Sequence, residues 1–132
     1  MKVLTIRQPW ASLIMAGLKE YEFRSWKTNY RGELLIHAGK TIDKEAEKRL
    51  KKYLPDVLPT EQILGKVELI DCTKVTPQFL NELRKINPDI YAKSMFKEEY
   101  AWNIKVLEKF DEPIETKGKL GLWNYIDEEK EI

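Results

Sequence analysis

Apolar and polar residues alternate along parts of this 132-residue chain, and along other parts apolar residues recur every three or four positions. Alternation or a short β-branched run is typical of strands, whereas the longer spacing gives a helix one apolar face. Strands are predicted at residues 2–6, 21–26, 32–39, 65–75 and 100–110. Helices are predicted at residues 9–17, 41–54 and 77–86, and a loop with a terminal turn that packs Leu122, Trp123 and Ile126 is predicted at 111–126. Strands do not alternate regularly with helices, so we expect an α+β fold, a small, partly open mixed β-barrel with two to three packed helices.

Three local signals predict where the first two helices begin and end. Pro9 suits the first helical position, where its missing N–H would have no partner. Gly17 can adopt the left-handed conformation that ends a helix. Thr41 or Asp43 is expected to cap the second helix with its side-chain oxygen.

Length and composition predict one domain, residues 1–132, with 42% apolar residues for its core. No apolar run approaches the ~20 residues of a membrane span, and the N-terminus lacks the pattern of a signal peptide. We therefore expect a cytoplasmic protein without membrane contact, with a monomer as the default. The lone Cys72 excludes an internal disulfide, and with the single His37 it excludes the common zinc clusters. No cofactor or metal site is predicted.

The charge is unevenly distributed although the net charge is only +1. Residues 1–31 contain six basic and two acidic side chains, a formal charge of +4. A basic region on a nearly neutral protein suits a short anionic ligand better than a long duplex. Ordinary scatter of surface charges is the alternative.

The stretch "KEYEFRSW" at residues 19–26 combines several chemically useful side chains. On a regular strand Glu22, Arg24 and Trp26 share one face, with residues 21, 23 and 25 behind them. Lys19, in the preceding turn, reaches the same region. Together they offer donors for an anion, an acceptor for a base edge and a ring for stacking. The alternative is a solvated strand face whose ion pair contributes less than ~1 kcal/mol.

Three other residue types leave their roles open. Of four tryptophans, two or three are expected in the core, and Trp26 has the best claim to stack a base because it shares a face with Arg24. His37, on an apolar strand, is expected to make a local hydrogen bond rather than act in catalysis. Cys72 is expected to be a small buried hydrophobe.

Four sequence blocks, "QPWASLIMAG", "KEYEFRSW", "YRGELLIHAG" and "GKVELIDC", together resemble the ASCH domain family of the PUA-like superfamily. The family signature Gly-x-Lys-x-x-Glu-x-Arg is met at Gly17, Lys19, Glu22 and Arg24. The resemblance covers residues 3–73, and residues 98–123 are similar in layout. It implies a small β-barrel with helices around a cleft that Lys19, Glu22 and Arg24 line.

The resemblance implies RNA binding or action on nucleotides. Our first hypothesis is a domain that binds RNA, a nucleotide or a nucleoside, most simply single-stranded or modified RNA. The residues expected to contact this ligand are Gln8, Trp10, Lys19, Glu22, Arg24, Trp26 and Arg31, with Gln8 and Arg31 at the rim.

A second hypothesis is a small hydrolase that uses Lys19 and Glu22 as catalytic residues, because some relatives resemble ribonucleases or amidohydrolases acting on acetylated cytidine. Those amidohydrolases use a lysine, a threonine and a glutamate, and Glu22 stands where the threonine would be. Ser25 is near, but on a regular strand it points to the other face. A third hypothesis is a protein-interaction module whose charges pair on a convex surface.

Overall fold

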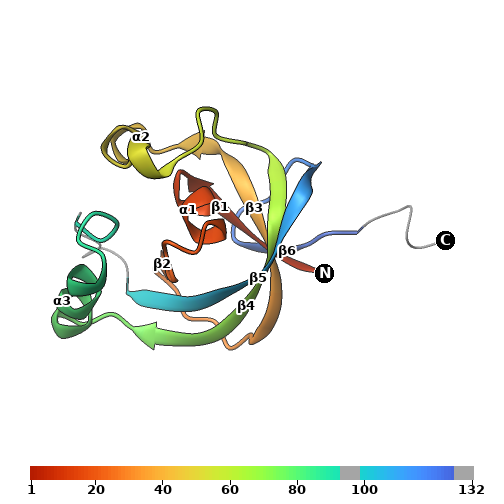
Figure 1. The fold of residues 1–132 in the computed structure, drawn as a ribbon. Helices are drawn as coiled ribbons and strands as arrows, with labels where there is room; N and C mark the ends of the chain where they lie inside the picture. Colours follow the sequence, from red (N-terminus) through yellow and green to blue (C-terminus); the bar gives the residue numbers. More distant parts are fainter. Residues whose placement is uncertain (93–98, 127–132) are drawn as a thin grey trace.

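The computed structural model describes residues 1–92 and 99–126, and their strands form one mixed sheet (Figure 1). The strands within these residues are β1 (Lys2–Gln8), β2 (Tyr21–Arg24), β3 (Gly32–Ile42), β4 (Gln62–Lys74), β5 (Tyr100–Glu115) and β6 (Leu122–Asn124). Their order in the sheet is β2-β5-β4-β3-β1-β6. β1 and β3 are parallel, and the other neighbouring strands are antiparallel. The sheet curves without closing, which confirms the predicted α+β fold and partly open barrel.

Three helices accompany the sheet in the described part of the chain: α1 (Trp10–Met15), α2 (Lys44–Arg49) and α3 (Pro77–Ile86). A 3₁₀ turn, η1 (Lys51–Tyr53), follows α2. The sheet curves around α1, whereas α2 and α3 lie on its open side (Figure 1). No described helix is long and apolar enough to cross a membrane.

The helix ends follow two of the three local signals. Gly17 has φ +77°, the left-handed conformation expected after α1. Asp43 caps α2, and its carboxylate accepts a hydrogen bond from the Ala46 N–H. Pro9 precedes α1 as its N-cap residue instead of forming its first turn, and the Gln8–Pro9 peptide bond is cis.

The C-terminal strands differ most from the predicted pattern. β5 continues to Glu115, beyond the predicted end at residue 110, because its last residues pair with the start of β4. The predicted terminal turn is instead β6, in which Trp123 pairs with Val3 of β1. Ile126 is 60% exposed, so its predicted packing is wrong. These residues become a strand because β1 supplies a pairing partner from the opposite end of the chain.

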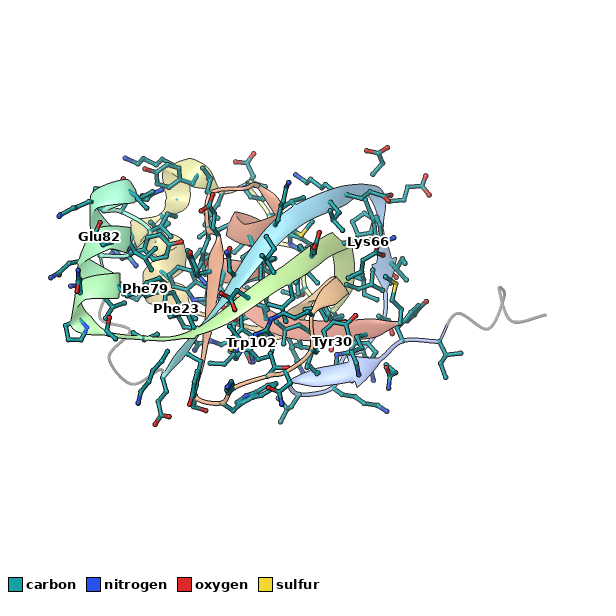
Figure 2. The ribbon with its side chains drawn as sticks, turned by 90° about the horizontal axis from the view of Figure 1, so that it is seen from below. Phe23, Tyr30, Lys66, Phe79, Glu82 and Trp102 are labelled. Atoms are coloured by element: carbon teal, nitrogen blue, oxygen red, sulfur yellow. The ribbon has the colours of Figure 1, made fainter. Side chains whose placement is uncertain are left out.

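The main core lies between the concave face of the sheet and α1. Trp102 of β5 is fully buried there, with Leu13 and Ile14 of α1 close by in the same cluster. Figure 2 shows Phe23 and Trp102 between the ribbons, whereas Glu82 lies on the outer side of α3. The core therefore fixes α1 and the start of β2 against the sheet, and these two elements flank Lys19.

Candidate functional site

A pocket of about 1020 Å³ opens at the gap between the two ends of the sheet. Its walls come from β2 at one end, from β1 and β3 near the other, from α2, and from the loop at residues 118–121. The signature side chains Lys19, Glu22 and Arg24 all line it. The open barrel thus leaves a pocket where its edge strands fail to meet.

A buried network of charges forms the inner wall of this pocket. Lys19 Nζ donates to Glu22 Oε1 at 2.9 Å, and Arg24 Nη2 donates to Glu22 Oε2 at 3.0 Å. Lys19 is 2% exposed and Glu22 8% exposed. One carboxylate therefore holds two cations, and the three side chains form what we call the inner triad.

The chain positions the inner triad through local backbone contacts. After the left-handed Gly17, the Lys19 N–H donates to Leu13 O of α1 at 3.3 Å, which ties the turn to the helix. Glu22 is then fixed by β2, where it pairs with Trp102 of β5. A turn and a strand together direct both side chains into the pocket.

Arg24 also spans the opening of the barrel. Its Nη2 donates to the carbonyl oxygen of Thr5 in β1 at 2.7 Å, and so joins β2 to the far part of the sheet. Its Nε is buried and has no hydrogen-bond partner in the described part of the chain. Nη1 is neither bonded nor buried there, so Arg24 keeps a donor for a ligand.

Burial lowers the pKa of Lys19 below its ordinary value of 10.5, although Glu22 opposes this shift through charge attraction and a hydrogen bond. The ammonium lies 5.4 Å from the centre of the Trp10 ring and 5.3 Å from that of Phe23. Such faces attract a cation. The lysine is therefore held between aromatic walls with one carboxylate partner.

Burial alone would raise the pKa of Glu22, but the charges of Lys19 and Arg24 and their hydrogen bonds outweigh it and lower this pKa. Glu22 is thus a carboxylate at neutral pH. Each of its oxygens accepts one hydrogen bond from the triad and retains capacity to accept another.

Trp26 lines the pocket with Glu22 and Arg24 as predicted, and Ser25, which strand alternation assigned to the other face, is also in the lining. β2 ends at Arg24, and a bend at Ser25 and Trp26 replaces the expected strand. Both residues line the pocket, and because Ser25 is not on a strand, strand alternation does not assign it to the opposite face. Trp26 is 39% exposed, with its ring edge-on to Trp102 at 4.8 Å and 87°.

Gln8 and Arg31 are not among the residues that line the pocket. Gln8 is fully buried, and its amide nitrogen donates to Ser12 Oγ at 2.9 Å and to Pro59 O at 2.7 Å. Arg31 Nη1 donates to the carbonyl oxygens of Thr28 at 3.0 Å and of its neighbour Tyr30 at 2.7 Å. Both side chains are engaged in structural contacts away from the predicted rim.

His37 and Thr5 line the pocket although sequence reasoning gave neither a place there. His37 is hydrogen-bonded as expected, but its Nε2 donates to Thr116 O at 2.7 Å, across 79 positions of sequence. Its Nδ1 lies 3.3 Å from Thr5 Oγ1. No sequence signal marks these contacts, because they depend on where the β5–β6 loop crosses β1 and β3.

Further charged side chains extend the lining beyond the inner triad. The lining contains six cationic and four acidic side chains, a formal surplus of two positive charges. The cationic ones are Arg7, Lys19, Arg24, Lys40, Arg49 and Lys119. Four of these lie outside the signature, on β1, β3, α2 and the β5–β6 loop. The basic character expected of the first 31 residues thus continues around the pocket.

The mixed, partly open sheet with a pocket at its gap defines a small β-rich domain of the PUA-like type. The model of the ASCH domain family matches residues 4–114, so the chain belongs to the ASCH domain family. This family is related to RNA-binding PUA-like domains.

Two curated relatives are similar to part of the chain. Activating signal cointegrator 1 of Homo sapiens is 39% identical over 80 residues, covering 52% of this chain and 14% of that protein. The Mus musculus protein of the same name is 41% identical over 80 residues, with the same coverage. The chain thus matches a small part of these relatives.

The solved structure of ASCH from Zymomonas mobilis has a TM-score of 0.62 with 14% identity, covering 98% of this chain and 90% of that one. A mutant of the same protein has a TM-score of 0.61 with 15% identity, covering 98% and 91%. At this identity the likeness concerns the fold.

Proposed function

We propose that this domain binds RNA by taking a nucleotide of a single-stranded or modified RNA into the pocket that the inner triad lines. The observation that carries the proposal is the place of Lys19, Glu22 and Arg24 in the wall of a 1020 Å³ cavity, with Lys19 and Glu22 buried and the Arg24 side chain 20% exposed. Buried ion networks add little stability compared with well-packed apolar side chains, so their presence in a cavity wall is a functional signal. The relation of the family to RNA-binding PUA-like domains supports the same function.

Each wall of the pocket has a chemical part in this proposal. Lys19 and the free Nη1 of Arg24 donate to acceptors on a base or phosphate, and Glu22 accepts from a base amino group. The rings of Trp10 and Trp26 supply stacking surfaces at the inner wall and at the opening. The modest positive surplus suits a short ligand.

A titration of fluorescent single-stranded RNA oligomers at two salt concentrations tests the proposal. We expect Arg24→Ala to weaken binding by roughly tenfold or more, because a charged donor is lost. Arg31→Ala removes the same side chain outside the pocket and should leave affinity nearly unchanged. Absence of wild-type binding, or equal losses in both variants with folding intact by circular dichroism, would contradict the proposal.

A hydrolase is the second candidate, because a buried Lys19 with a lowered pKa and a serine, Ser25, among the lining residues are features of reactive sites. Incubation with acetylated cytidine and with labelled RNA distinguishes the two functions. Turnover that Lys19→Met abolishes would favour hydrolysis, whereas RNA binding without turnover leaves the binding proposal in place. The protein-interaction hypothesis required these charges on a convex surface, and their place in a pocket disfavours it.

A further inference from the structure

We infer that the β5–β6 loop and Trp26 form a second base-stacking site at the mouth of the pocket, so that the ligand is at least two nucleotides long. This inference rests on the proposed function and extends it to the neighbour of the nucleotide inside the pocket. The mouth is formed by Trp26, Leu120 and Gly121, all of which line the cavity.

The loop is held in place by a chain of hydrogen bonds that the inner triad does not use. Trp123 Nε1 donates to Thr5 Oγ1 at 2.8 Å, and Thr5 Oγ1 lies 3.3 Å from His37 Nδ1. His37 Nε2 donates to Thr116 O at 2.7 Å, at the start of the loop. At its other end, Gly121 O accepts from the Thr5 N–H at 3.2 Å. Both ends of the loop are therefore tied to β1 or β3.

Gly118 lets the middle of the loop pack closely against His37 and Thr5, two members of this hydrogen-bond network. A Cβ at this position would lie 2.4 Å from His37 Cε1 and 2.9 Å from Thr5 Oγ1, closer than side chains tolerate. Glycine thus permits the loop to lie directly over the histidine. The loop is a packed rim of the pocket, and Leu120 follows two residues later.

Leu120 and Trp26 present apolar surface at the mouth despite this packing. Leu120 is 96% exposed and Trp26 39% exposed. The rings of Trp26 and Trp102 pack nearly perpendicular with centroids 4.8 Å apart, and the Trp26 carbonyl oxygen accepts from Trp102 Nε1 at 3.4 Å. The Cβ position of Gly121 lies 3.7 Å from the Trp26 ring, which brings the loop and the ring together. A single exposed leucine is ordinary, but a leucine and a fixed indole at one cavity mouth form a recognition surface.

A nucleotide base is the occupant that fits this mouth. A base has two flat apolar faces and polar edges, so it can stack on an indole while its edges stay in water. The base next to the one inside the pocket is carried to the mouth by the same sugar-phosphate chain. Lys119 lines the pocket beside Leu120 and supplies a cation for the intervening phosphate.

The test uses 5′-phosphorylated homodinucleotides of each of the four bases. They are compared with abasic dinucleotides, which lack the first or the second base but retain every phosphate. Affinities are measured by competition with the labelled RNA oligomer. For at least one dinucleotide, the second base should strengthen wild-type binding by roughly tenfold, as expected for one stacked base. Leu120→Ser should reduce this gain severalfold and leave the affinity for the dinucleotide without the second base unchanged, and Trp26→Ala should reduce the gain as well. Val57→Ser, at an apolar residue that is 82% exposed and lies outside the lining, is the matched control.

Equal affinity of the wild-type protein for the complete and abasic dinucleotides would overturn the inference, and so would a full gain in Leu120→Ser. If no RNA binds at all, the proposed function fails first and the inference falls with it. Gly118→Ala tests the packed rim separately, because the added Cβ must displace the loop from His37. Like Leu120→Ser, the Gly118→Ala variant should lose the affinity that the second base adds. Retention of the full gain in affinity would show that packing of the loop over His37 does not position the stacking site.

Discussion

The inner triad and the Arg31–Asp71 pair place the same chemical groups in opposite environments. Arg24 is 3.0 Å from Glu22, with side chains 20% and 10% exposed, and Lys19 completes that network inside the protein. Arg31 is 3.5 Å from Asp71, with side chains 38% and 62% exposed. Water screens the attraction between Arg31 and Asp71, whereas the charges of the inner triad are mostly shielded from water and must neutralise one another. Burial, more than the identity of the paired groups, therefore decides how much each charge contributes to the stability of the fold.

The contrast also bears on function. The exposed pair can be lost with little effect, and water solvates both of its members. In the inner triad each group must be satisfied by the others or by a ligand, because an unpaired charge inside a protein is strongly unfavourable. A ligand that supplies acceptors to Lys19 and Arg24 would therefore gain more there than at an exposed site.

The largest effect is expected from Glu22→Gln, which keeps the shape of the side chain and removes its charge. Two buried cations then lose their carboxylate, and we expect the free energy of unfolding to fall by about 3–5 kcal/mol. Urea unfolding followed by circular dichroism measures this loss. Asp71→Asn is the matched change at the exposed pair. Similar losses of unfolding free energy in the two variants would contradict the contrast between the inner triad and the Arg31–Asp71 pair.

Arg24→Lys is expected to have the next largest effect. Lysine keeps the positive charge near Glu22 but lacks the planar fork that bonds Glu22 and Thr5 O together. Loss of the charge-assisted bond across the barrel opening should lower the free energy of unfolding by about 1.5–3 kcal/mol. The same urea experiment checks it, and unchanged stability would mean that Arg24 does not hold the two parts of the sheet together.

A smaller effect is expected in the pH dependence of stability. Because burial lowers the pKa of Lys19 below 10.5, the unfolded chain binds more protons than the folded one between the lowered pKa and 10.5. Stability should therefore rise with pH in this window, by at most about 1.4 kcal/mol per pH unit for one group. Lys19→Met should make stability nearly independent of pH in this window. An unchanged slope of stability against pH would mean that another group causes the rise. Measurements stay below pH 10.0, because burial raises the pKa of Tyr91 to about 12 and ionisation of this tyrosine in the unfolded chain then lowers stability.

The smallest effect is expected at the exposed pair itself. A double-mutant cycle with Arg31→Gln and Asp71→Asn should give a coupling energy below about 1 kcal/mol that decreases with added salt. Thermal unfolding of the four proteins measures it. A coupling energy as large as the loss of unfolding free energy in Glu22→Gln would show that the difference in exposure does not explain how the two sites contribute to stability.

The sequence predicted the α+β class, most strands and the identity of the inner triad. Strand alternation and the signature spacing are local, so residues 19–24 already indicated which side chains come together. The signature could not indicate that these charges are buried, because burial depends on α1 and on strands far along the chain. It therefore left a solvated strand face open as the alternative.

Prediction failed where contacts join distant segments. Ser25 was placed on a strand, whereas the length of β2 is set by its pairing with β5 and strand geometry is lost once that pairing stops at Arg24. His37 was expected to be hydrogen-bonded, but its partner Thr116 was not identified because it lies on a loop 79 residues away. Arg31 is a different case, because it was assigned to the rim but its guanidinium makes local bonds to carbonyl oxygens of its own turn.

By itself, then, the sequence determined most of the elements and which charged residues of the signature stand close together, since both follow from spacing along a few residues. Only the tertiary structure decided that β1 and β2 face each other across a gap, that Arg24 spans it, and that the β5–β6 loop packs over His37. The physical reason is that a pocket is a space between segments. Its depth, exposure and charge depend on how remote strands pair, which no local pattern specifies.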